Sequence, residues 1–368
     1  MKILLLGNNL TNGGLQRVLS LWARGFVNEG YEVSLVLMDT QLPVTFTVPS
    51  TIKTYQLDTP ECNIMYLSLW VRNRRWRKEF RGIISEAKPN VIISLMPELS
   101  FAAYLAAKKF KIPFIHTEHN AFERPDYVKM GYYTKFEKFI LNRFYDRVTV
   151  LCDADKSIIG KKIKNVTVLP NPTPYEPSSN VPTKKKMVFA AGRLDAWHYK
   201  GFDLLLKAWK GIAEKDSDWQ LVIAGISVSG KGEAFLKEMT KDLGIEDCVH
   251  FVGFKEDMLP LYQEAAIFVL SSRYEGWGVV LTEAMSQGCA CVACDFNGRQ
   301  AEILTNEKEG LLCRPNDVAE LESAITRLIS DEPLRIRLGE KAMERSEFFS
   351  IDNTTKRWNE IFREMNLI

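Results

Sequence analysis

Two glutamates, Glu275 and Glu283, are separated by seven residues in the segment SSRYEGWGVVLTEAMSQG (271–288). The segment follows the apolar run AAIFVL, which is typical of a buried strand, and its second half has the spacing of an amphipathic helix that ends at Gly288. Open α/β sheets bind ligands at the carboxyl ends of their strands, so both carboxylates are expected to face one ligand. Because a carboxylate accepts hydrogen bonds from two hydroxyls at once, the pair is suited to the vicinal diols of a sugar.

Backbone N–H groups lie between the two glutamates. The loop Gly276–Trp277–Gly278 leads into the expected helix, whose first N–H groups, at Val279, Val280 and Leu281, have no partner within a helix. Such a helix N-terminus favours phosphate. The segment therefore predicts a ligand that carries both sugar hydroxyls and phosphates. The alternative is that these are two ordinary surface glutamates.

Two cations, Arg193 and Lys200, lie in AAGRLDAWHYKGFDLLLKAW (190–209), between an expected strand and a helix that starts near residue 201. Fixed cations of this kind can stabilise a departing phosphate without a metal ion. An ordinary loop with two cations is the alternative.

A glycine turn and a histidine follow two expected strands in the first half. Gly13 and Gly14 lie in GNNLTNGGLQR (7–17), where backbone N–H groups could approach an anion, although the spacing is not that of the dinucleotide fingerprint and a simple tight turn remains open. His119 follows the strand in FIHTEHN (114–120), and a neutral imidazole there could orient a hydroxyl. His116 lies inside that strand and is expected to be structural.

A metal site is not expected. The string Asp153–Ala154–Asp155 resembles the metal-binding D-x-D of other enzymes, but it follows RVTVLC and precedes KSII, which favours a helix N-cap. The seven cysteines have no zinc-type spacing and are expected to be small core residues in a reducing cytoplasm.

The stretch WVRNRRWRKEFR (70–81) combines six basic residues with aromatic ones. Such a stretch suits an interfacial helix on an anionic membrane, and the apolar side chains expected to share one face are Trp76 and Phe80. A solvated surface is the alternative, and no nucleic-acid-binding motif accompanies it. The candidate membrane or acceptor residues are Trp70, Arg74, Arg75, Trp76, Arg77 and Lys78.

Composition places the chain among globular proteins. It has 368 residues, 46% hydrophobic and 26% charged, enough for two domains. There is no apolar run long enough for a membrane span, and the start MKILLLGNN is expected to be a buried strand rather than a signal peptide. Residues 1–169 contain 24 Lys and Arg against 15 Asp and Glu, which fits an anionic acceptor or membrane surface.

Apolar runs alternate with amphipathic stretches on both sides of the proline-rich segment LPNPTPYEPSSNVP (169–182). Alternation predicts parallel sheets covered by helices on both faces. The expected organisation is a first domain over 1–170, a linker over 171–183, a second domain over 184–348 and a C-terminal helix over 349–368.

Taken together, the E-x7-E pair, the G-R-L and K-G segments, the Gly-Gly turn and His119 resemble the retaining nucleotide-sugar glycosyltransferases of family 4. This resemblance implies the GT-B fold, with two doubly wound Rossmann-like domains facing a cleft and a C-terminal helix that crosses back to the first domain. It implies that His119, Arg193, Lys200 and Glu275 are catalytic. The implied donor-binding residues are Gly13, Gly14, Gly253, Phe254, Gly276, Trp277, Gly278, Val279, Val280, Leu281 and Glu283.

The resemblance further implies transfer of a hexose or N-acetylhexosamine from a UDP-sugar to a hydroxyl of a lipid-linked saccharide, with retained anomeric configuration and no cofactor or metal. The expected location is the cytoplasm, at the inner face of the cell membrane. A nucleotide-sugar epimerase of the same fold and a non-catalytic nucleotide-sugar-binding subunit are the alternatives. The insertion of Trp197 and His198 before Lys200 leaves the reach of that lysine open.

Overall fold

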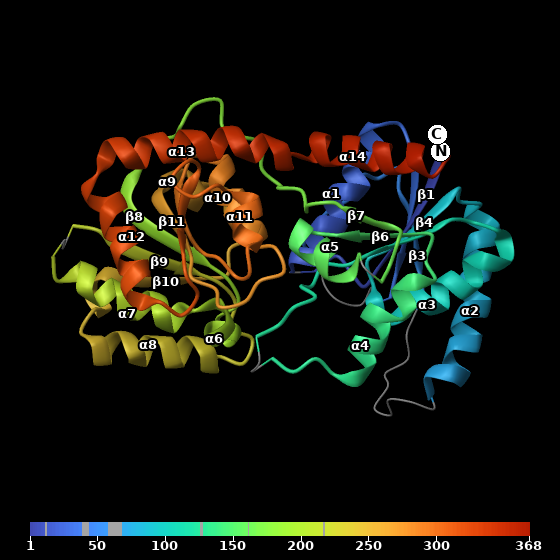
Figure 1. Ribbon diagram of the computed structural model, residues 1–368, viewed down its shortest axis with the longest axis horizontal. Helices are drawn as coiled ribbons and strands as arrows, with labels where there is room; N and C mark the ends of the chain where they lie inside the picture. Colours follow the sequence, from blue (N-terminus) through green and yellow to red (C-terminus); the bar gives the residue numbers. More distant parts are fainter. Residues whose placement is uncertain (12, 39–43, 58–67, 126–127, 161, 216–217) are drawn as a thin grey trace. The chain divides into compact units, whose positions relative to one another are not determined.

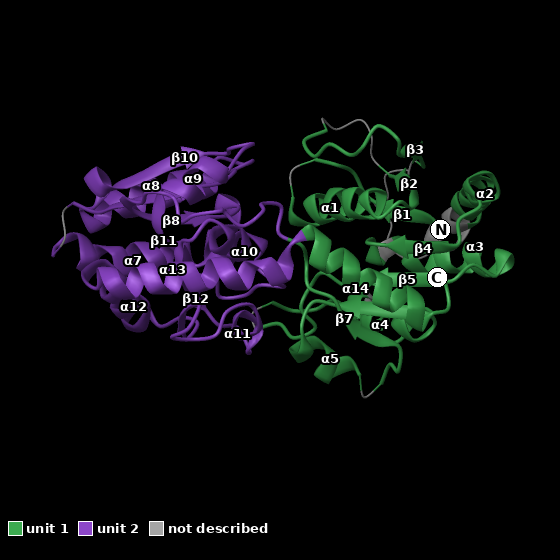
Figure 2. Ribbon diagram, turned by 90° about the horizontal axis from the view of Figure 1, so that it is seen from above, with its two compact units in different colours: residues 1–172, 351–368 green, residues 173–350 purple. Residues whose placement is uncertain are grey.

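The computed structural model describes residues 1–368 except 12, 39–43, 58–67, 126–127, 161 and 216–217. The chain divides into two compact units, which Figure 2 shows in different colours. Unit 1 comprises Met1–Pro172 with Ile351–Ile368, and unit 2 comprises Thr173–Ser350. Each unit contains one sheet with helices packed around it (Figure 1).

The sheet of unit 1 is parallel, with the strand order β3-β2-β1-β4-β5-β6-β7. Helices bury both faces of such a sheet, so its central strands are continuous apolar runs, and Leu4, Leu5 and Ile92 are fully buried. Its strands are β1 (Lys2–Gly7), β2 (Glu32–Leu37), β3 (Lys53–Gln56), β4 (Val91–Ser94), β5 (Phe114–Thr117), β6 (Arg147–Val150) and β7 (Val166–Val168). Its helices are α1 (Gly14–Asn28), α2 (Ser68–Ala87), α3 (Pro97–Ala107), α4 (Tyr132–Phe139), α5 (Asp153–Ile159) and α14 (Ile351–Glu364), with the 3-10 turns η1 (Lys108–Phe110) and η2 (Leu141–Arg143).

The last helix, α14, packs on the first, α1. The Trp358 ring meets Trp22 edge to face at 5.1 Å between centroids, and Phe362 lies 5.9 Å from Phe26. A Cβ on Gly25 would lie 2.3 Å from Thr355 Oγ1, so only glycine permits this approach of the two helices. The return of the C-terminal helix to the first unit is therefore confirmed.

The sheet of unit 2 is also parallel, with the strand order β10-β9-β8-β11-β12-β13. Its strands are β8 (Lys185–Ala191), β9 (Gln220–Ala224), β10 (Val249–Gly253), β11 (Ala265–Leu270), β12 (Ala290–Cys294) and β13 (Gly310–Cys313). Its helices are α6 (Trp197–Lys200), α7 (Phe202–Ala213), α8 (Lys231–Leu243), α9 (Leu259–Glu264), α10 (Val279–Ser286), α11 (Arg299–Ile303), α12 (Val318–Ser330) and α13 (Glu332–Ser346), with η3 (Leu194–Ala196), η4 (Glu246–Cys248) and η5 (Glu347–Phe349). The strands β8 and β11 are neighbours, so the loops that follow them meet at one edge of the sheet.

Some elements carry too little sequence signal to be predicted. The strand β3 has four residues, none of them buried, and α13 buries its apolar side chains Leu334, Leu338 and Ala342 among charged neighbours. Within the residues described, no helix combines the length and the apolar character needed to cross a bilayer.

Candidate active site

Lys200 and Glu275 come together at the carboxyl edge of the unit 2 sheet. The Lys200 Nζ lies 2.5 Å from Glu275 Oε1, and Ser272 Oγ donates to the same oxygen at 2.8 Å. The two side chains are 22% and 12% exposed, so the pair is sheltered but reachable. An ammonium and a carboxylate placed side by side can bind the two halves of a ligand that is both anionic and rich in hydroxyls.

Gly201 allows Lys200 to lie close to the end of β11. It has a φ of 66°, and a Cβ there would lie 1.9 Å from the carbonyl oxygen of Ser271. The Ser271 hydroxyl in turn donates to the Lys200 carbonyl at 2.9 Å. The glycine of the K-G segment thus permits the close approach that places Lys200 beside Glu275, despite the inserted Trp197 and His198.

A buried ion pair joins Arg273, in the loop after β11, to Asp203 in the first turn of α7. The guanidinium donates to both Asp203 oxygens at 2.6 and 2.7 Å, and also to the His198 carbonyl at 2.6 Å. Both side chains are about nine-tenths buried. Bidentate pairs of this kind fix geometry, so Arg273 and Asp203 are positioning residues. Arg273 lies in the segment SSRYEG and Asp203 in KGFD, but the sequence gives no sign that these two residues form a pair.

Asp195 connects the loop after β8 to the start of α8. It accepts hydrogen bonds from the hydroxyls of Ser227 and Ser229 at 2.8 and 2.6 Å, and from the Gly232 N–H at 3.3 Å. The Ser229 hydroxyl and the other donors hold the pKa of Asp195 well below its usual value. The carboxylate therefore stays ionised and shapes the loop that begins with Arg193, which is exposed to solvent.

At the start of α10, two residues differ from expectation: the Leu281 N–H is already hydrogen-bonded, and the Trp277 side chain is buried. Gly278 is the N-cap with a φ of 90°, and the helix begins at Val279, but the Leu281 N–H already donates to the Gly278 carbonyl at 2.9 Å. Leu281 is thus removed from the expected set of phosphate-binding N–H groups, whereas Val279 and Val280 open the helix. The Trp277 indole is 3% exposed and packs on Phe349 at 5.6 Å, so its side chain belongs to the core rather than to a binding surface.

Glu283 lies one helical turn deeper. It is 2% exposed, and the buried Tyr262 hydroxyl donates to its Oε2 at 2.6 Å. Tyr262 thus sets the orientation of the carboxylate, a role that the sequence does not indicate. At the end of β10, Gly253 has a φ of 68° and Phe254 is 43% exposed.

In unit 1, His119 lies just after β5 with both ring nitrogens in hydrogen-bonding contact. Its Nε2 is 2.9 Å from Thr117 Oγ1 and its Nδ1 is 3.1 Å from Asn171 Oδ1. Burial lowers the pKa of His119 from 6.5 to about 4, so the imidazole is neutral at neutral pH. In the same unit, Gly14 starts α1 after the exposed Gly13, and a Cβ on Gly14 would meet no atom within 4 Å.

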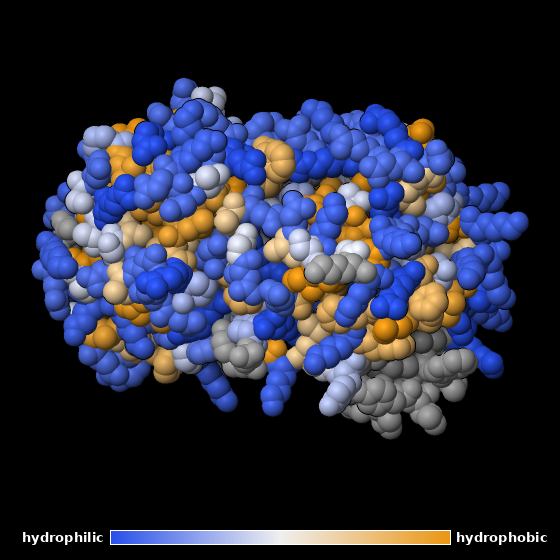
Figure 3. Space-filling view, in the orientation of Figure 1, coloured by the Kyte–Doolittle hydropathy of each residue, from blue (hydrophilic) through white to orange (hydrophobic). Residues whose placement is uncertain are grey.

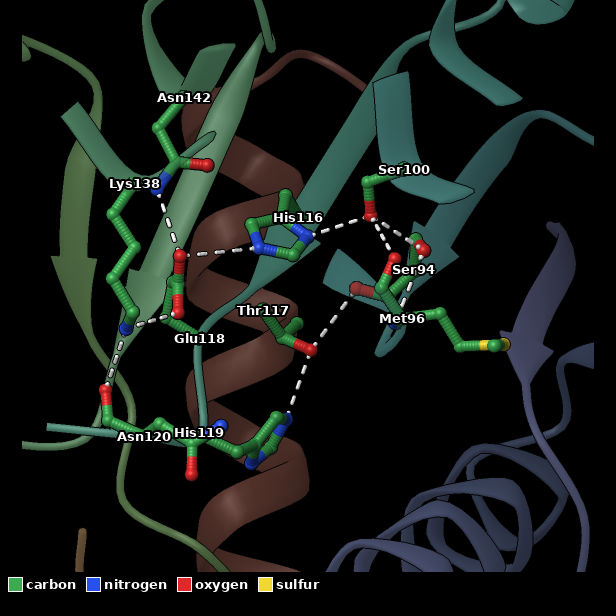
Figure 4. A network of polar contacts seen from close by, with 10 residues as sticks. All are labelled: Ser94, Met96, Ser100, His116, Thr117, Glu118, His119, Asn120, Lys138 and Asn142. Atoms are coloured by element: carbon green, nitrogen blue, oxygen red, sulfur yellow. Dashed lines mark hydrogen bonds and ion pairs between the residues drawn. The ribbon is translucent and has the colours of Figure 1, made fainter. Parts of the chain in front are cut away.

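A buried charge network anchors the segment that carries His119 (Figure 4). Glu118 accepts from Lys138 Nζ at 2.8 Å and from Asn142 Nδ2 at 3.0 Å, and His116 Nε2 lies 3.5 Å away. Burial alone would raise the pKa of Glu118, but Lys138 and His116 hold it well below the usual 4.5. Lys138 also donates to the Asn120 carbonyl at 3.0 Å, so α4 is tied directly to the residue after His119.

The D-x-D string has a structural role in this fold. Asp153 and Asp155 lie in the first turn of α5, whose N-cap is Cys152 rather than an aspartate. The buried Asp155 accepts from the Phe122 N–H at 2.8 Å. Among the described residues, no group of three or more His, Cys, Asp and Glu side chains is arranged to hold a metal ion.

The structure corrects the assignment of Trp76 to a membrane face. Trp76 is 5% exposed and stacks on the fully buried Phe80 at 5.0 Å, because this side of α2 covers the core of unit 1. Arg74, Arg75 and Lys78 are exposed and Arg77 is partly buried. The side chain of Trp70 lies outside the described part of the chain.

The predicted residues thus fall into two groups. Unit 2 brings Lys200 and Glu275 into contact, with Arg193 and the start of α10 on the same sheet edge. Unit 1 contains His119 and the glycine turn.

Comparisons with known proteins give the same division. Residues 173–345 match the family described as "Glycosyl transferases group 1", and residues 12–176 match "Glycosyltransferase Family 4". A relative from Campylobacter jejuni, "GalNAc-alpha-(1->4)-GalNAc-alpha-(1->3)-diNAcBac-PP-undecaprenol alpha-1,4-N-acetyl-D-galactosaminyltransferase", is 28% identical over 99% of both chains.

Solved structures of GT-B proteins share the fold over nearly the whole chain. The sucrose-phosphate synthase of Thermosynechococcus elongatus is similar with a TM-score of 0.83 and 20% identity, over 99% of this chain and 98% of the other. The Anabaena protein Alr3699/HepE in complex with UDP is similar with a TM-score of 0.80 and 19% identity, over 99% and 100%. With its two family matches running from residue 12 to residue 345, this chain belongs to the GT-B glycosyltransferases that combine a family 4 domain with a group 1 domain.

Proposed function

We propose that this chain transfers a hexose or N-acetylhexosamine from a UDP-sugar to a hydroxyl of a lipid-linked saccharide in bacterial cell-surface glycan assembly, with retention and without a metal. The observation that carries the proposal is the contact between Lys200 and Glu275 beside the start of α10. In this proposal, Lys200 is the cation that binds the diphosphate and Glu275 is the carboxylate that binds the sugar hydroxyls. The undecaprenol in the name of the Campylobacter relative supports the lipid carrier, and the UDP bound to the Anabaena protein supports the nucleotide.

In the proposed reaction, the bond between the anomeric carbon and the diphosphate oxygen breaks. A bond from that carbon to the acceptor oxygen forms on the same face, and the acceptor proton passes to the departing phosphate oxygen. Arg193, Lys200 and the N–H groups of Val279 and Val280 stabilise the charge that develops on the diphosphate. Neutral His119 orients a hydroxyl that replaces Thr117 or Asn171 at one ring nitrogen, and its low pKa keeps the imidazole uncharged at neutral pH.

The two glutamates are expected to divide the donor between them. Glu283→Gln should weaken binding of UDP itself, because we assign this carboxylate to the ribose diol. Glu275→Gln should leave UDP affinity nearly unchanged but weaken the intact UDP-sugar. A charged hydrogen bond contributes about 1.5–3 kcal/mol, so each loss is expected to be about 10- to 100-fold in Kd. Calorimetry with UDP and UDP-sugar measures both, and equal effects of both variants on both ligands would contradict the division.

The proposed activity is tested by incubating the protein with a panel of UDP-sugars, with and without a polyprenyl-diphosphate saccharide. The expected result is acceptor-dependent UDP release that persists in EDTA, with a product whose anomeric configuration by NMR equals that of the donor. Conversion of the UDP-sugar to an isomer without acceptor would instead identify an epimerase. Tight binding without turnover on any acceptor would identify a non-catalytic subunit, and a strict metal requirement would remove the metal-free mechanism.

A further inference from the structure

Large apolar side chains are exposed along one side of α4. Tyr132, Phe136 and Ile140 are 91%, 50% and 37% exposed, and their spacing of four places them on one helix face. Phe144, directly after η2 and four residues beyond Ile140, is 51% exposed. We call these four side chains the α4 patch. Figure 3 shows apolar side chains gathered over this part of unit 1.

The α4 patch belongs to a firmly held element. The opposite side of α4 carries Lys138, whose ammonium is buried against Glu118, and the adjoining Phe139 ring lies 5.8 Å from Phe122. The Phe144 ring also rests on Phe101 of α3 at 5.6 Å. The helix therefore cannot turn its apolar face inward without breaking a buried ion pair. Large apolar side chains that stay exposed together in this way are typical of an interaction site.

In the segments 104–111 and 128–144, which contain the end of α3 and the α4 patch, the exposed charged side chains are cations. Residues 104–111 contain three lysines and no acidic residue, and the only acidic residue in 128–144 is Glu137, which is buried. Lys108 lies over the Tyr104 ring at 5.7 Å, and Tyr104 stacks on the same Phe101 that supports Phe144. The exposed cations of these two segments are Lys108, Lys109, Lys111, Lys129, Lys135 and Arg143.

We propose that the α4 patch docks this glycosyltransferase onto an anionic lipid bilayer. Aromatic and aliphatic side chains enter the interfacial layer, while the cations meet the phosphates of the lipid headgroups. A second copy of the chain fits the surface less well, because a two-fold contact through the α4 patch would bring the same cations face to face. The buried aromatic face of α2 has no such access to lipid.

Docking through α4 also connects to the acceptor, a step that rests on the proposed function. Lys138 on this helix holds the Asn120 carbonyl, next to His119. A bilayer bound at the α4 patch would thus lie against the element that anchors the His119 segment. The sugar of a lipid-linked acceptor is presented at that same bilayer surface.

The test is sedimentation with phosphatidylglycerol vesicles and with phosphatidylcholine vesicles, at low and high salt. The wild type is expected to bind phosphatidylglycerol vesicles, with a fraction that resists high salt because it depends on apolar contacts. Phe136→Ser/Ile140→Ser should lower the partition coefficient about a hundred-fold, since each apolar side chain withdrawn from the bilayer costs the transfer of several CH₂ groups. UDP-sugar turnover on a water-soluble acceptor should not change, which separates this result from a failure of the proposed function.

Two controls make the assignment specific. Val228→Ser/Ile336→Ser removes comparably exposed apolar side chains from unit 2, and it should bind vesicles like the wild type. Arg74→Gln/Arg75→Gln/Lys78→Gln neutralises the exposed cations of α2 and should retain the salt-resistant binding. If the α2 variant loses that binding while the α4 variant keeps it, the assignment to α4 is overturned. Concentration-dependent dimerisation that only the α4 variant abolishes, without vesicle binding by the wild type, would identify a second copy as the occupant and also overturn the proposal.

Discussion

Lys200→Ala is expected to lower turnover by about two to three orders of magnitude, the range found when one preorganised charge-stabilising donor is removed. The ammonium lies 2.5 Å from Glu275 Oε1, so its loss removes the cation assigned to the diphosphate and one partner of the carboxylate. Affinity for UDP should fall much less, because Val279 and Val280 still present their N–H groups. Steady-state kinetics with the preferred UDP-sugar, together with calorimetry on UDP, measure the two effects separately.

Lys186→Ala is the matched control for Lys200→Ala. Lys186 forms an ion pair with Asp218 at 2.9 Å in the same unit, but both side chains are more than half exposed. Exposed pairs contribute little to stability, so the control should keep both the fold and the turnover. Arg193→Ala should resemble Lys200→Ala in its loss of turnover. Near-normal turnover in either site variant would remove the role assigned to these cations.

Lys138→Met is expected to destabilise unit 1 by about 3–5 kcal/mol, because it leaves Glu118 buried without its cation. The Glu118 and Lys138 side chains are 1% and 4% exposed, so solvent cannot take over the lost contact. Lys135→Met, on the exposed side of the same helix, should change stability by less than about 0.5 kcal/mol. Glu118→Gln/Lys138→Met should recover part of the loss, because no charge is then left unpaired.

The same pair gives unit 1 a defined acid sensitivity. The pKa of Glu118 is lower in the folded state than its usual 4.5, so its contribution to stability is complete above that value and is lost as the pH falls below it. The free energy of unfolding of the wild type and of Glu118→Gln/Lys138→Met is measured with denaturant at neutral pH and below pH 4.5. The wild type should lose more stability on acidification than the double variant. Equal stability of Lys138→Met and the wild type at neutral pH would contradict the role of the network.

Sequence patterns indicate the glutamates and cations of the candidate site because these motif residues lie next to strand ends, which meet at one edge of a parallel sheet. These patterns do not reveal that Arg273 pairs with Asp203, or that Tyr262 donates a hydrogen bond to Glu283. Those contacts join residues far apart in the chain, and only the packing of the loops brings them together. Trp76 shows a different limit: an aromatic face on a basic helix has the same spacing whether it covers a protein core or a bilayer. The sequence does not mark the exposed side chains of α4, because the helix is short and the segment lacks a dense run of charge.

The packing of α14 on α1 has a consequence for synthesis of the chain. Unit 1 is built from two distant segments, so Trp22 and Phe26 receive their contacts from Trp358 and Phe362 only when residues 351–368 have been made. Unit 2 is one continuous segment, Thr173–Ser350, so all its residues are synthesised before residues 351–368. During translation, unit 2 can therefore complete its core before unit 1, which contains His119. Until then, the first-made segment exposes an aromatic surface that chaperones can recognise.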